Sequence, residues 1–383
     1  HPEHQVPVGF EDLAELAHDE QTDPWELAAR YASAMLPGIF KQDDPLLKIS
    51  YAPEDRNALR DILAQIPGDT FRTSDALGWT YQFWQTKEKK RVNVLEKKIE
   101  GADLYAVTQL FTEPYMVRFL LQNSLGAWWL SLYPDSSLKD QWEFYKEQVQ
   151  HDFSTIVSDI NELTLLDPCC GSGHFLVEAF HMLLKMRDEL GEDKKGAIEK
   201  ILTKNLYGLE IDHRCVQIAA FSLALEAWKE GWEPNKQLPL PNLAWCGQSI
   251  KSDKKEWTSY AGENGLYEGI FSQYYDFFKN ADYLGSLIPI ENSLVSFKEI
   301  EEKIITLLST EKGDPVSEIF GETTIGILKV ANILNKHNFD LIVTNPPFLG
   351  YKKFGKILKD FCQESFPDER HDLSTARLRR GFS

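Results

Sequence analysis

The sequence predicts an α/β protein in which an α-helical N-terminal domain precedes a parallel, doubly wound sheet. The first observation is that residues 10–150 carry apolar side chains at helical spacing. The second is that, after residue 160, short apolar runs alternate with helical segments, as in a sheet with crossover helices on both faces. With 383 residues and roughly 100–200 residues per domain, we expect two domains, 1–150 and 151–383.

The N-terminal domain is predicted to consist of several helices. Apolar residues recur at mixed three and four spacing over 11–35, and the pattern repeats over 57–66. Residues 70–84 are rich in aromatic side chains, which we expect to form the packing face of another helix. We expect the charged run 87–91 to end this helix.

The segment 108–120 contains the start of a further predicted helix. Thr112 is a plausible N-cap and Pro114 suits the first turn. Its apolar stripe is expected to comprise Met116, Phe119, Leu120 and Leu125. Gly126 should interrupt this stripe, because glycine is a poor helix former.

The second domain is predicted to contain a parallel sheet. We expect strands within 163–167, 206–211, 242–247 and 339–344. Helical periodicity over 174–190 and 215–228 supplies crossovers between the first three strands. Residues 251–338 look mostly helical and form an insertion before the last strand.

Composition limits the function classes. A net charge of −18 and a pI near 5.0 argue against a chain that binds nucleic acid over its whole surface, so a basic surface would have to be local. The five cysteines lack the paired spacing of a zinc site, and an odd count suits a reducing cytoplasm. From this spacing we expect no metal site, and because no apolar run reaches about 18 residues, we expect no membrane span.

The stretch DPCCGSGHFL contains a glycine turn between the first strand and its helix. Gly171 and Gly173 let the backbone turn tightly and approach a ligand closely. In a doubly wound sheet, ligands bind outside the carboxyl ends of the strands, where this turn must lie. The alternative is that GSG is a turn without a ligand.

The stretch GLEID places carboxylates at the end of the second strand. Glu210 or Asp212 could accept both ribose hydroxyls of a nucleoside. The alternative is an acid exposed at a strand end. The glycine turn favours the first interpretation, because both strand ends face one crevice.

The stretch FDLIVTNPPFLG joins a buried strand to Asn345-Pro346-Pro347-Phe348. An amide oxygen and a proline carbonyl are two acceptors that can hold an amino group. Phe348 could stack on the ring that bears this amine. Asn-Pro-Pro as ordinary turn chemistry is the alternative.

Over residues 70–370 these motifs in order resemble the adenine-N6 DNA methyltransferases. DPCCGSGHFL is similar to their cofactor loop, LYGLEID to their ribose-binding strand and NPPF to their catalytic tetrad; TQLFTEPYMVRFL and GWTYQFWQ are similar to large methylases of restriction and phage-defence systems. The resemblance implies a Rossmann-like class I methyltransferase sheet. It also implies an S-adenosyl-L-methionine site made by Thr112, Asp167, Pro168, Cys169, Gly171, Ser172, Gly173, Phe175, Glu210, Ile211 and Gln248.

Catalysis is implied to rest on Asn345, Pro346, Pro347 and Phe348. A target adenine is flipped out of double-stranded DNA, and its amine takes the methyl group directly. Neither a metal nor a covalent enzyme intermediate is needed, so Cys169 and Cys170 are interpreted as small loop residues rather than nucleophiles. Other restriction or defence-system subunits are expected partners. Gln248 stands where the family often has an acid that contacts the cofactor adenine.

Two alternatives remain open. Protein-glutamine and RNA methylases also use Asn-Pro-Pro motifs, so the substrate could be another amine or amide. The chain could also be an inactive fragment, because related catalytic domains continue after the fourth strand. We therefore expect the C-terminal part of the catalytic domain and the target-recognition domain to be missing, with apolar surface exposed near Val343.

Overall fold

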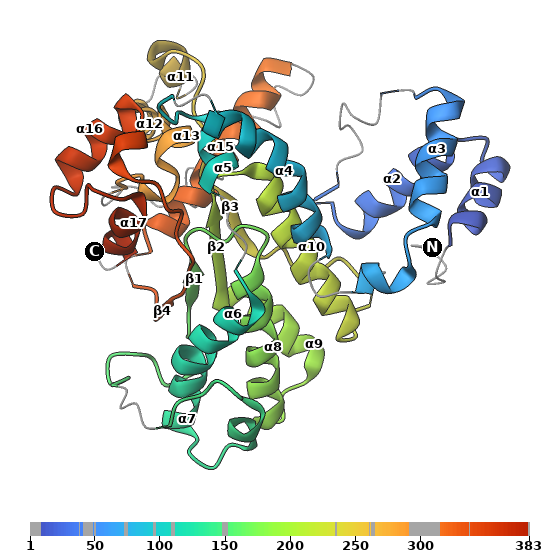
Figure 1. The fold of residues 1–383 in the computed structure, drawn as a ribbon, viewed down its shortest axis with the longest axis horizontal. Coiled ribbons are helices and arrows are strands. Elements are labelled where there is room, and N and C mark those ends of the chain that lie inside the picture. Colours follow the sequence, from blue (N-terminus) through green and yellow to red (C-terminus); the bar gives the residue numbers. More distant parts are fainter. Residues whose placement is uncertain are drawn as a thin grey trace.

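The fold is that of the α/β class predicted, with a helical N-terminal region and a parallel sheet (Figure 1). The computed structural model describes residues 9–37, 39–40, 49, 51–72, 76–94, 97–108, 112–147, 152–233, 236–259, 261, 265–290, 315–336 and 338–381. Within these ranges, no helix combines the length and apolar content that a membrane crossing requires.

The sheet has the order β3-β2-β1-β4, and every neighbouring pair is parallel. Its strands are β1 (Leu165–Asp167), β2 (Leu206–Glu210), β3 (Asn242–Trp245) and β4 (Leu341–Ile342). All four lie within the predicted runs. Leu165 pairs with Leu206 on one side and Leu341 on the other, so β1 is central.

The two faces of the sheet are covered by two hydrophobic cores. Leu165 and Leu341 belong to the first core, with α8 (His174–Glu189) and α10 (His213–Lys229). Leu166 belongs to the second, since successive strand side chains point to opposite faces. The second core includes residues of α12 (Gly265–Phe278), α15 (Pro315–Leu334), α16 (Lys356–Ser365) and α17 (Leu373–Gly381).

The connections between strands are helical. Between β1 and β2, α8 is followed by α9 (Lys194–Lys200) and the π-helical turn η5 (Ile201–Asn205). The described part of 251–338 forms α11 (Lys254–Ser259), α12, α13 (Ala281–Leu284), η6 (Gly285–Leu287) and α15, which confirms its helical character. Residues 291–314 of this insertion lie outside the described ranges.

The N-terminal region is helical, as predicted. Its elements are α1 (Phe10–Asp19), α2 (Pro24–Met35), α3 (Pro53–Ala64), η2 (Gly68–Arg72), α4 (Ala76–Val94), α5 (Ala102–Thr108), α6 (Pro114–Leu121), η3 (Gln122–Gly126), α7 (Ala127–Leu132) and η4 (Ser137–Gln141). Figure 1 shows α1, α2 and α3 grouped away from the sheet. Residues of α6 and α7 instead share the first core with β1. The boundary at residue 150 stays a prediction.

Three details of this region differ from the prediction. The N-cap position of α6 is Glu113, not Thr112, and Pro114 is its first residue. Thr112 turns inward, is 8% exposed and accepts a hydrogen bond from Asn345 Nδ2.

The second difference concerns the buried face of α6. Met116, Phe119 and Leu120 are exposed, whereas Val117, Leu121 and Leu125 are buried. Of the predicted stripe, only Leu125 was right, because tertiary packing selects the i, i+4, i+8 face. Gly126 does not interrupt the helix. The chain passes through the π-helical turn η3 there, and a Cβ on Gly126 would lie 3.1 Å from the Trp142 ring.

The third difference is α4, which continues through the charged run to Val94. Arg91 stabilises this part of the helix by pairing with Glu88 one turn earlier. The expected aromatic packing face is also wrong in part, because Phe83 and Trp84 are 70% and 77% exposed.

The end of the described chain covers the edge of the sheet. Val343 is only 7% exposed, which contradicts the expected apolar surface there, although neighbouring Ile342 keeps 36%. Val343 is buried in the first core, whereas α17 lies against Ile342, where a Cβ on Gly381 would be 3.5 Å from Ile342 Cδ1.

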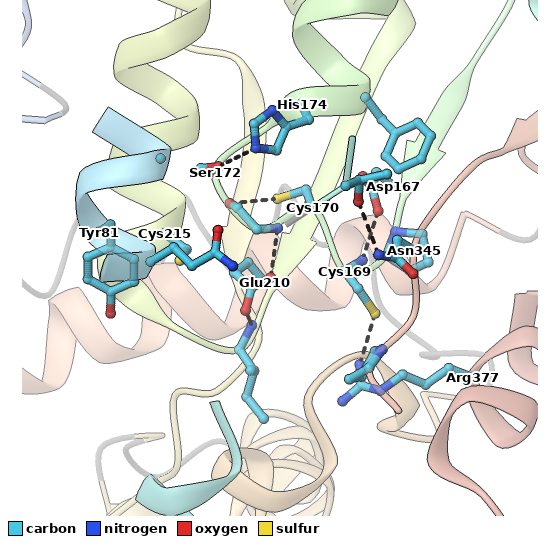
Figure 2. A pocket seen from close by; sticks show the side chains of 18 of the residues that line it. Tyr81, Asp167, Cys169, Cys170, Ser172, His174, Glu210, Cys215, Asn345 and Arg377 are labelled. Carbon is cyan, nitrogen blue, oxygen red and sulfur yellow. Dashed lines mark hydrogen bonds between the residues drawn. The ribbon is translucent and has the colours of Figure 1, made fainter. Parts of the chain in front are cut away.

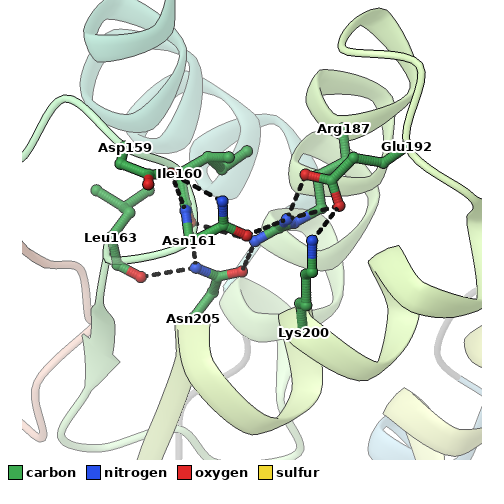
Figure 3. Close-up of polar contacts among 8 residues, drawn as sticks. All are labelled: Asp159, Ile160, Asn161, Leu163, Arg187, Glu192, Lys200 and Asn205. Carbon is green, nitrogen blue, oxygen red and sulfur yellow. Dashed lines mark hydrogen bonds and ion pairs between the residues drawn. The ribbon is translucent and has the colours of Figure 1, made fainter.

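A buried arginine fixes the amino end of the sheet (Figure 3). Arg187 of α8 donates to Glu192, Asn161 and Asn205 and to the carbonyl oxygen of Ile160. Asn205, just before β2, donates to the carbonyl oxygens of Ile160 and Leu163, just before β1. This network holds the N-terminal ends of β1 and β2 side by side.

Candidate active site

A cavity lies at the carboxyl ends of β1, β2 and β4 (Figure 2). Parallel strands end at one edge of a sheet, so residues distant in sequence meet there. Asp167 ends β1, Glu210 ends β2, and Asn345 follows β4 by three residues. Helices α4 and α17 supply further walls of the cavity.

The glycine turn after β1 depends on left-handed backbone. Gly171 has φ +53° and Gly173 has φ +94°, both in the region that favours glycine. The Gly171 N–H donates to Glu210 Oε2 at 2.8 Å. Gly173 precedes α8, and a Cβ there would lie 3.0 Å from Ala219 Cβ of α10. The turn therefore joins the ends of two strands and brings α8 close to α10.

Glu210 is a buried carboxylate, not an acid exposed at a strand end. It is 7% exposed and accepts backbone N–H groups from Gly171, Ile211 and Asp212. Burial raises the pKa of Glu210, while the backbone bonds from Asp212 and Gly171 oppose this. These bonds fix the orientation of the carboxylate at the cavity wall.

Asp212, the other candidate at this strand end, has a structural role. Its side chain caps α10 by accepting from the Arg214 N–H and also accepts from the Tyr81 hydroxyl. Burial raises the pKa of Tyr81, and the bond to Asp212 adds to the rise. Asp212 therefore anchors α4 to α10, and of the two candidate acids at this strand end only Glu210 lines the cavity.

Asp167 is the most buried acid of the cavity, at 1% exposure. Its Oδ1 accepts from the Cys169 N–H at 3.1 Å, while its Oδ2 has no partner in the described part of the chain. Burial raises its pKa to about 7. The site thus holds an acceptor atom that a ligand could satisfy.

The Asn-Pro-Pro-Phe turn contributes Asn345 and Pro347 to the cavity wall. Asn345 Nδ2 donates to Thr112 Oγ1 at 3.1 Å. Two predicted site segments, separated by more than 200 residues of sequence, are therefore in contact. Phe348 is 55% exposed and lies outside the lining.

Most of the predicted site residues meet in this one cavity. Its lining includes Thr112, Asp167, Pro168, Cys169, Gly171, Ser172, Phe175, Glu210, Ile211, Asn345 and Pro347. Four predicted residues are not in the lining: Gly173, Gln248, Pro346 and Phe348.

Gln248 is the clearest departure from the prediction. It lines a separate hollow and packs against α15, since a Cβ on Gly326 would lie 2.2 Å from Gln248 Oε1. The chain leaves β3 at Trp245, whose Nε1 donates to the Ile211 carbonyl oxygen. The residues that follow then lead toward α15. The structure therefore does not bring Gln248 to the cavity.

Other lining residues were missed by the sequence analysis. They are Gly78, Tyr81, Gln82, Leu104, Cys170, His174, Cys215 and Arg377. A signal for α4 was available, because Gly78, Tyr81 and Gln82 share one helical face. Arg377 had no such signal, since its position depends on how α17 packs.

The cysteines beside the turn are neutral. Burial raises the pKa of Cys169 and raises that of Cys170 further above the usual range. A thiol is a much weaker nucleophile than a thiolate. Both residues therefore suit the predicted role as small loop residues.

The comparisons with known proteins agree with this geometry. Residues 144–375 match the family model described as MmeI, DNA-methyltransferase domain. The chain is 29% identical over 356 residues to the adenine-specific methyltransferase BrxX of Escherichia coli O9:H4 (strain HS), covering 85% of this chain and 29% of that protein. It is 28% identical over 392 residues to the adenine-specific methyltransferase PglX of Lacticaseibacillus casei (strain Zhang), covering 94% and 32%.

A third relative is more distant. It is a putative type II restriction enzyme and methyltransferase of Methanocaldococcus jannaschii, 26% identical over 257 residues, with 56% of this chain and 20% of that protein covered. The chain therefore spans a third or less of the length of these curated relatives.

Proposed function

The chain belongs to the family of the MmeI DNA-methyltransferase domain, and on that premise we propose that it methylates the N6 amino group of adenine in double-stranded DNA. The methyl donor in this proposal is S-adenosyl-L-methionine. The relatives named as adenine-specific methyltransferases support the choice of adenine. We place the activity in a larger cytoplasmic enzyme of a restriction or phage-defence system that acts with further subunits.

The observation that carries the proposal is one cavity that gathers polar groups from three strand ends. Asp167, Glu210 and Asn345 belong to β1, β2 and the turn after β4, and all three line it. A cavity at the carboxyl edge of a parallel sheet is the usual ligand site of this architecture. A turn without a ligand would not require three buried or half-buried polar side chains.

The residues present fit S-adenosyl-L-methionine. Glu210 would accept the ribose hydroxyls, because its carboxylate is held at the wall by three backbone N–H groups. Asp167 Oδ2 lacks a partner among the described residues and would accept the cofactor's ammonium group. A cation beside Asp167 would also favour its ionised form, since its pKa stands at about 7.

When bound, the cofactor supplies an electrophilic methyl group. Asn345 and the carbonyl oxygen of Pro346 would accept hydrogen bonds from the target amine. Positive charge develops on that nitrogen during transfer, and two fixed acceptors stabilise it. The bond from Asn345 Nδ2 to Thr112 holds the amide, so that its oxygen is the atom left to accept. Phe348 is exposed enough to stack on a flipped base.

Calorimetry with S-adenosyl-L-methionine tests the site. We expect Glu210→Ala to weaken binding by about 1–3 kcal/mol, the cost of removing a polar contact at a buried site. Gln248→Ala is the matched control, since Gln248 lies outside the cavity and its removal should leave affinity unchanged. An equal effect of the two substitutions would remove Glu210 from the site.

A transfer assay with labelled cofactor tests the substrate. Double-stranded DNA, RNA and protein are offered separately to the chain. Label on the N6 atom of adenine in DNA is the expected result. Label on RNA or on protein glutamine alone would contradict the assignment to DNA.

A further inference from the structure

Arg377 is a buried cation in the cavity wall. It belongs to α17, is 5% exposed and lines the same cavity as Asp167 and Glu210. Its Nη1 donates to Ser286 Oγ at 2.5 Å and to Cys169 Sγ at 3.3 Å (Figure 2 shows the contact with Cys169). Its Nη2 approaches the Leu284 carbonyl oxygen at 3.5 Å.

These partners do not neutralise the charge. A hydroxyl, a thiol with a raised pKa and a carbonyl are all uncharged groups. Glu210 of the same cavity favours the charge of Arg377 through space, but no hydrogen bond joins these two side chains. Arg377 Nε is buried and has no hydrogen-bond partner among the described residues. Buried arginines normally use their donors fully and face a carboxylate. Arg377 therefore has unused capacity to donate to a ligand in the cavity.

Gly285 shows where the guanidinium lies. A Cβ on Gly285 would be 3.1 Å from Arg377 Nη2 and 3.3 Å from Ile211 Cδ1. Arg377 and Ile211 thus flank the same glycine, and Ile211 is next to Glu210 in the chain. If Glu210 holds the ribose, as the proposed function requires, the attached base would lie close to Ile211 and within reach of Arg377.

This part of the cavity lacks the polar group that the sequence suggested for it. Gln248 was expected to contact the cofactor adenine, but its side chain lies against α15. Arg377 is a polar side chain beside Ile211 that can take this place. An arginine only donates, and adenine presents ring nitrogens that only accept.

We propose that Arg377 recognises the adenine ring of the cofactor by donating a hydrogen bond to one of its ring nitrogens. The inference rests on the proposed function, because it takes the adenosyl group as the ligand. It makes α17, which follows the catalytic turn, part of the nucleoside site. The planar guanidinium can also lie against the base, which lysine cannot imitate.

The test measures binding of S-adenosylhomocysteine and its 1-deaza, 3-deaza and 7-deaza analogues by calorimetry. Each analogue replaces one ring nitrogen with a C–H group. For the wild-type chain, we expect one analogue to bind about tenfold more weakly, equivalent to about 1.4 kcal/mol. Arg377→Met should weaken S-adenosylhomocysteine to a similar degree and abolish the difference between that analogue and the parent compound.

Arg380→Met is the matched control. Arg380 lies on the same helix and borders a neighbouring hollow that Arg377 also reaches, but it does not line the cavity, so this change should leave all four affinities as in the wild type. The analogue series on the wild-type chain needs no substitution, so it tests the idea even if Arg377→Met fails to fold.

Three results would overturn the inference. Equal binding of all four compounds to the wild-type chain would show that no ring nitrogen accepts from the protein. Tighter binding of S-adenosylhomocysteine to Arg377→Met would show that Arg377 obstructs the site. If the wild-type chain binds none of the compounds, the proposed cofactor itself is wrong, and the inference fails with it.

Discussion

The two ends of the sheet each hold a buried arginine, and the two arginines have different kinds of hydrogen-bond partner. At the amino end, Arg187 donates to the carboxylate of Glu192 and to Asn161 and Asn205. At the carboxyl end, Arg377 contacts a thiol, a hydroxyl and a carbonyl, none of them charged. Each leaves its Nε without a partner among the described residues, so the difference lies in charge compensation.

This contrast separates structural polar groups from groups available to a ligand. The Arg187 network is charge-compensated within the protein and joins the entrances of β1 and β2. At the other end, neither Asp167 nor Arg377 has a hydrogen-bonded partner of opposite charge among the described residues, although Glu210 favours the charge of Arg377 through space. A polar group without a compensating partner in a cavity lowers the stability of the fold. Functional sites commonly contain such groups, because a ligand supplies the missing partner.

The largest expected effect concerns the amino end. Arg187→Met should lower the free energy of unfolding by about 3–5 kcal/mol, because it leaves the partly buried Glu192 without its arginine. Urea denaturation measures the change. Arg377→Met removes no carboxylate partner, so it should cost clearly less. Equal losses of unfolding free energy in the two variants would show that the two arginines do not differ in this way.

The next effect concerns catalysis at the carboxyl end. Asn345→Ala should lower the turnover of DNA methylation by roughly 10²–10³, as when a preorganised charge-stabilising group is removed. Cofactor affinity should stay nearly unchanged, because the amide faces the target amine. Single-turnover methylation and calorimetry give the two values. Normal methylation by this variant would end the proposed role of Asn345.

A third prediction uses the raised pKa of Asp167. Its pKa is about 7 in the folded chain, whereas the ordinary value is 3.8. The wild-type chain should therefore lose stability between about pH 4 and pH 7, because the carboxyl ionises first in the unfolded state. Asp167→Asn avoids this loss and should be the more stable protein at pH 8. Urea denaturation at pH 4 and at pH 8 measures the difference between the two proteins.

Glu192→Gln should change the pH dependence of stability in the opposite direction to Asp167→Asn. Burial alone would raise the pKa of Glu192, but Lys200 and Arg187 lower it overall. Its contribution to stability is present above the ordinary pKa and is lost as the pH falls, so this variant should be less stable than the wild type at neutral pH. If stability changed with pH in the same way in Asp167→Asn and Glu192→Gln, the two carboxyl groups would not have opposite effects on stability.

The smallest effect concerns the link between α4 and α10. Tyr81→Phe removes the hydroxyl that donates to Asp212 and should cost about 0.5–1.5 kcal/mol of stability. Thermal unfolding measures this. Thr86→Val on the same helix is the control, because its hydroxyl is exposed and bonds to a carbonyl of its own helix. A larger loss from Thr86→Val would show that the Tyr81 contact does not hold α4.

The sequence predicted the parts of the site that depend on local chemistry. Strand ends, the left-handed glycines and the Asn-Pro-Pro turn are properties of short segments, so Gly171, Glu210 and Asn345 were found. Gln248 lines a separate hollow because its direction depends on how the chain leaves β3 and meets α15. Arg377 was missed because only tertiary packing brings α17 to the cavity.

The close approach at Gly173 has a consequence for how the site tolerates change. The turn presses against Ala219 so tightly that a Cβ would meet Ala219 Cβ at 3.0 Å and its Cα at 3.2 Å. A bulkier residue at Ala219 would act as a wedge between α8 and α10, since packed interiors have little free space. It would tilt the turn and draw the Gly171 N–H away from Glu210. The small side chain of Ala219 is therefore required for the geometry of the glycine turn, although Ala219 does not line the cavity.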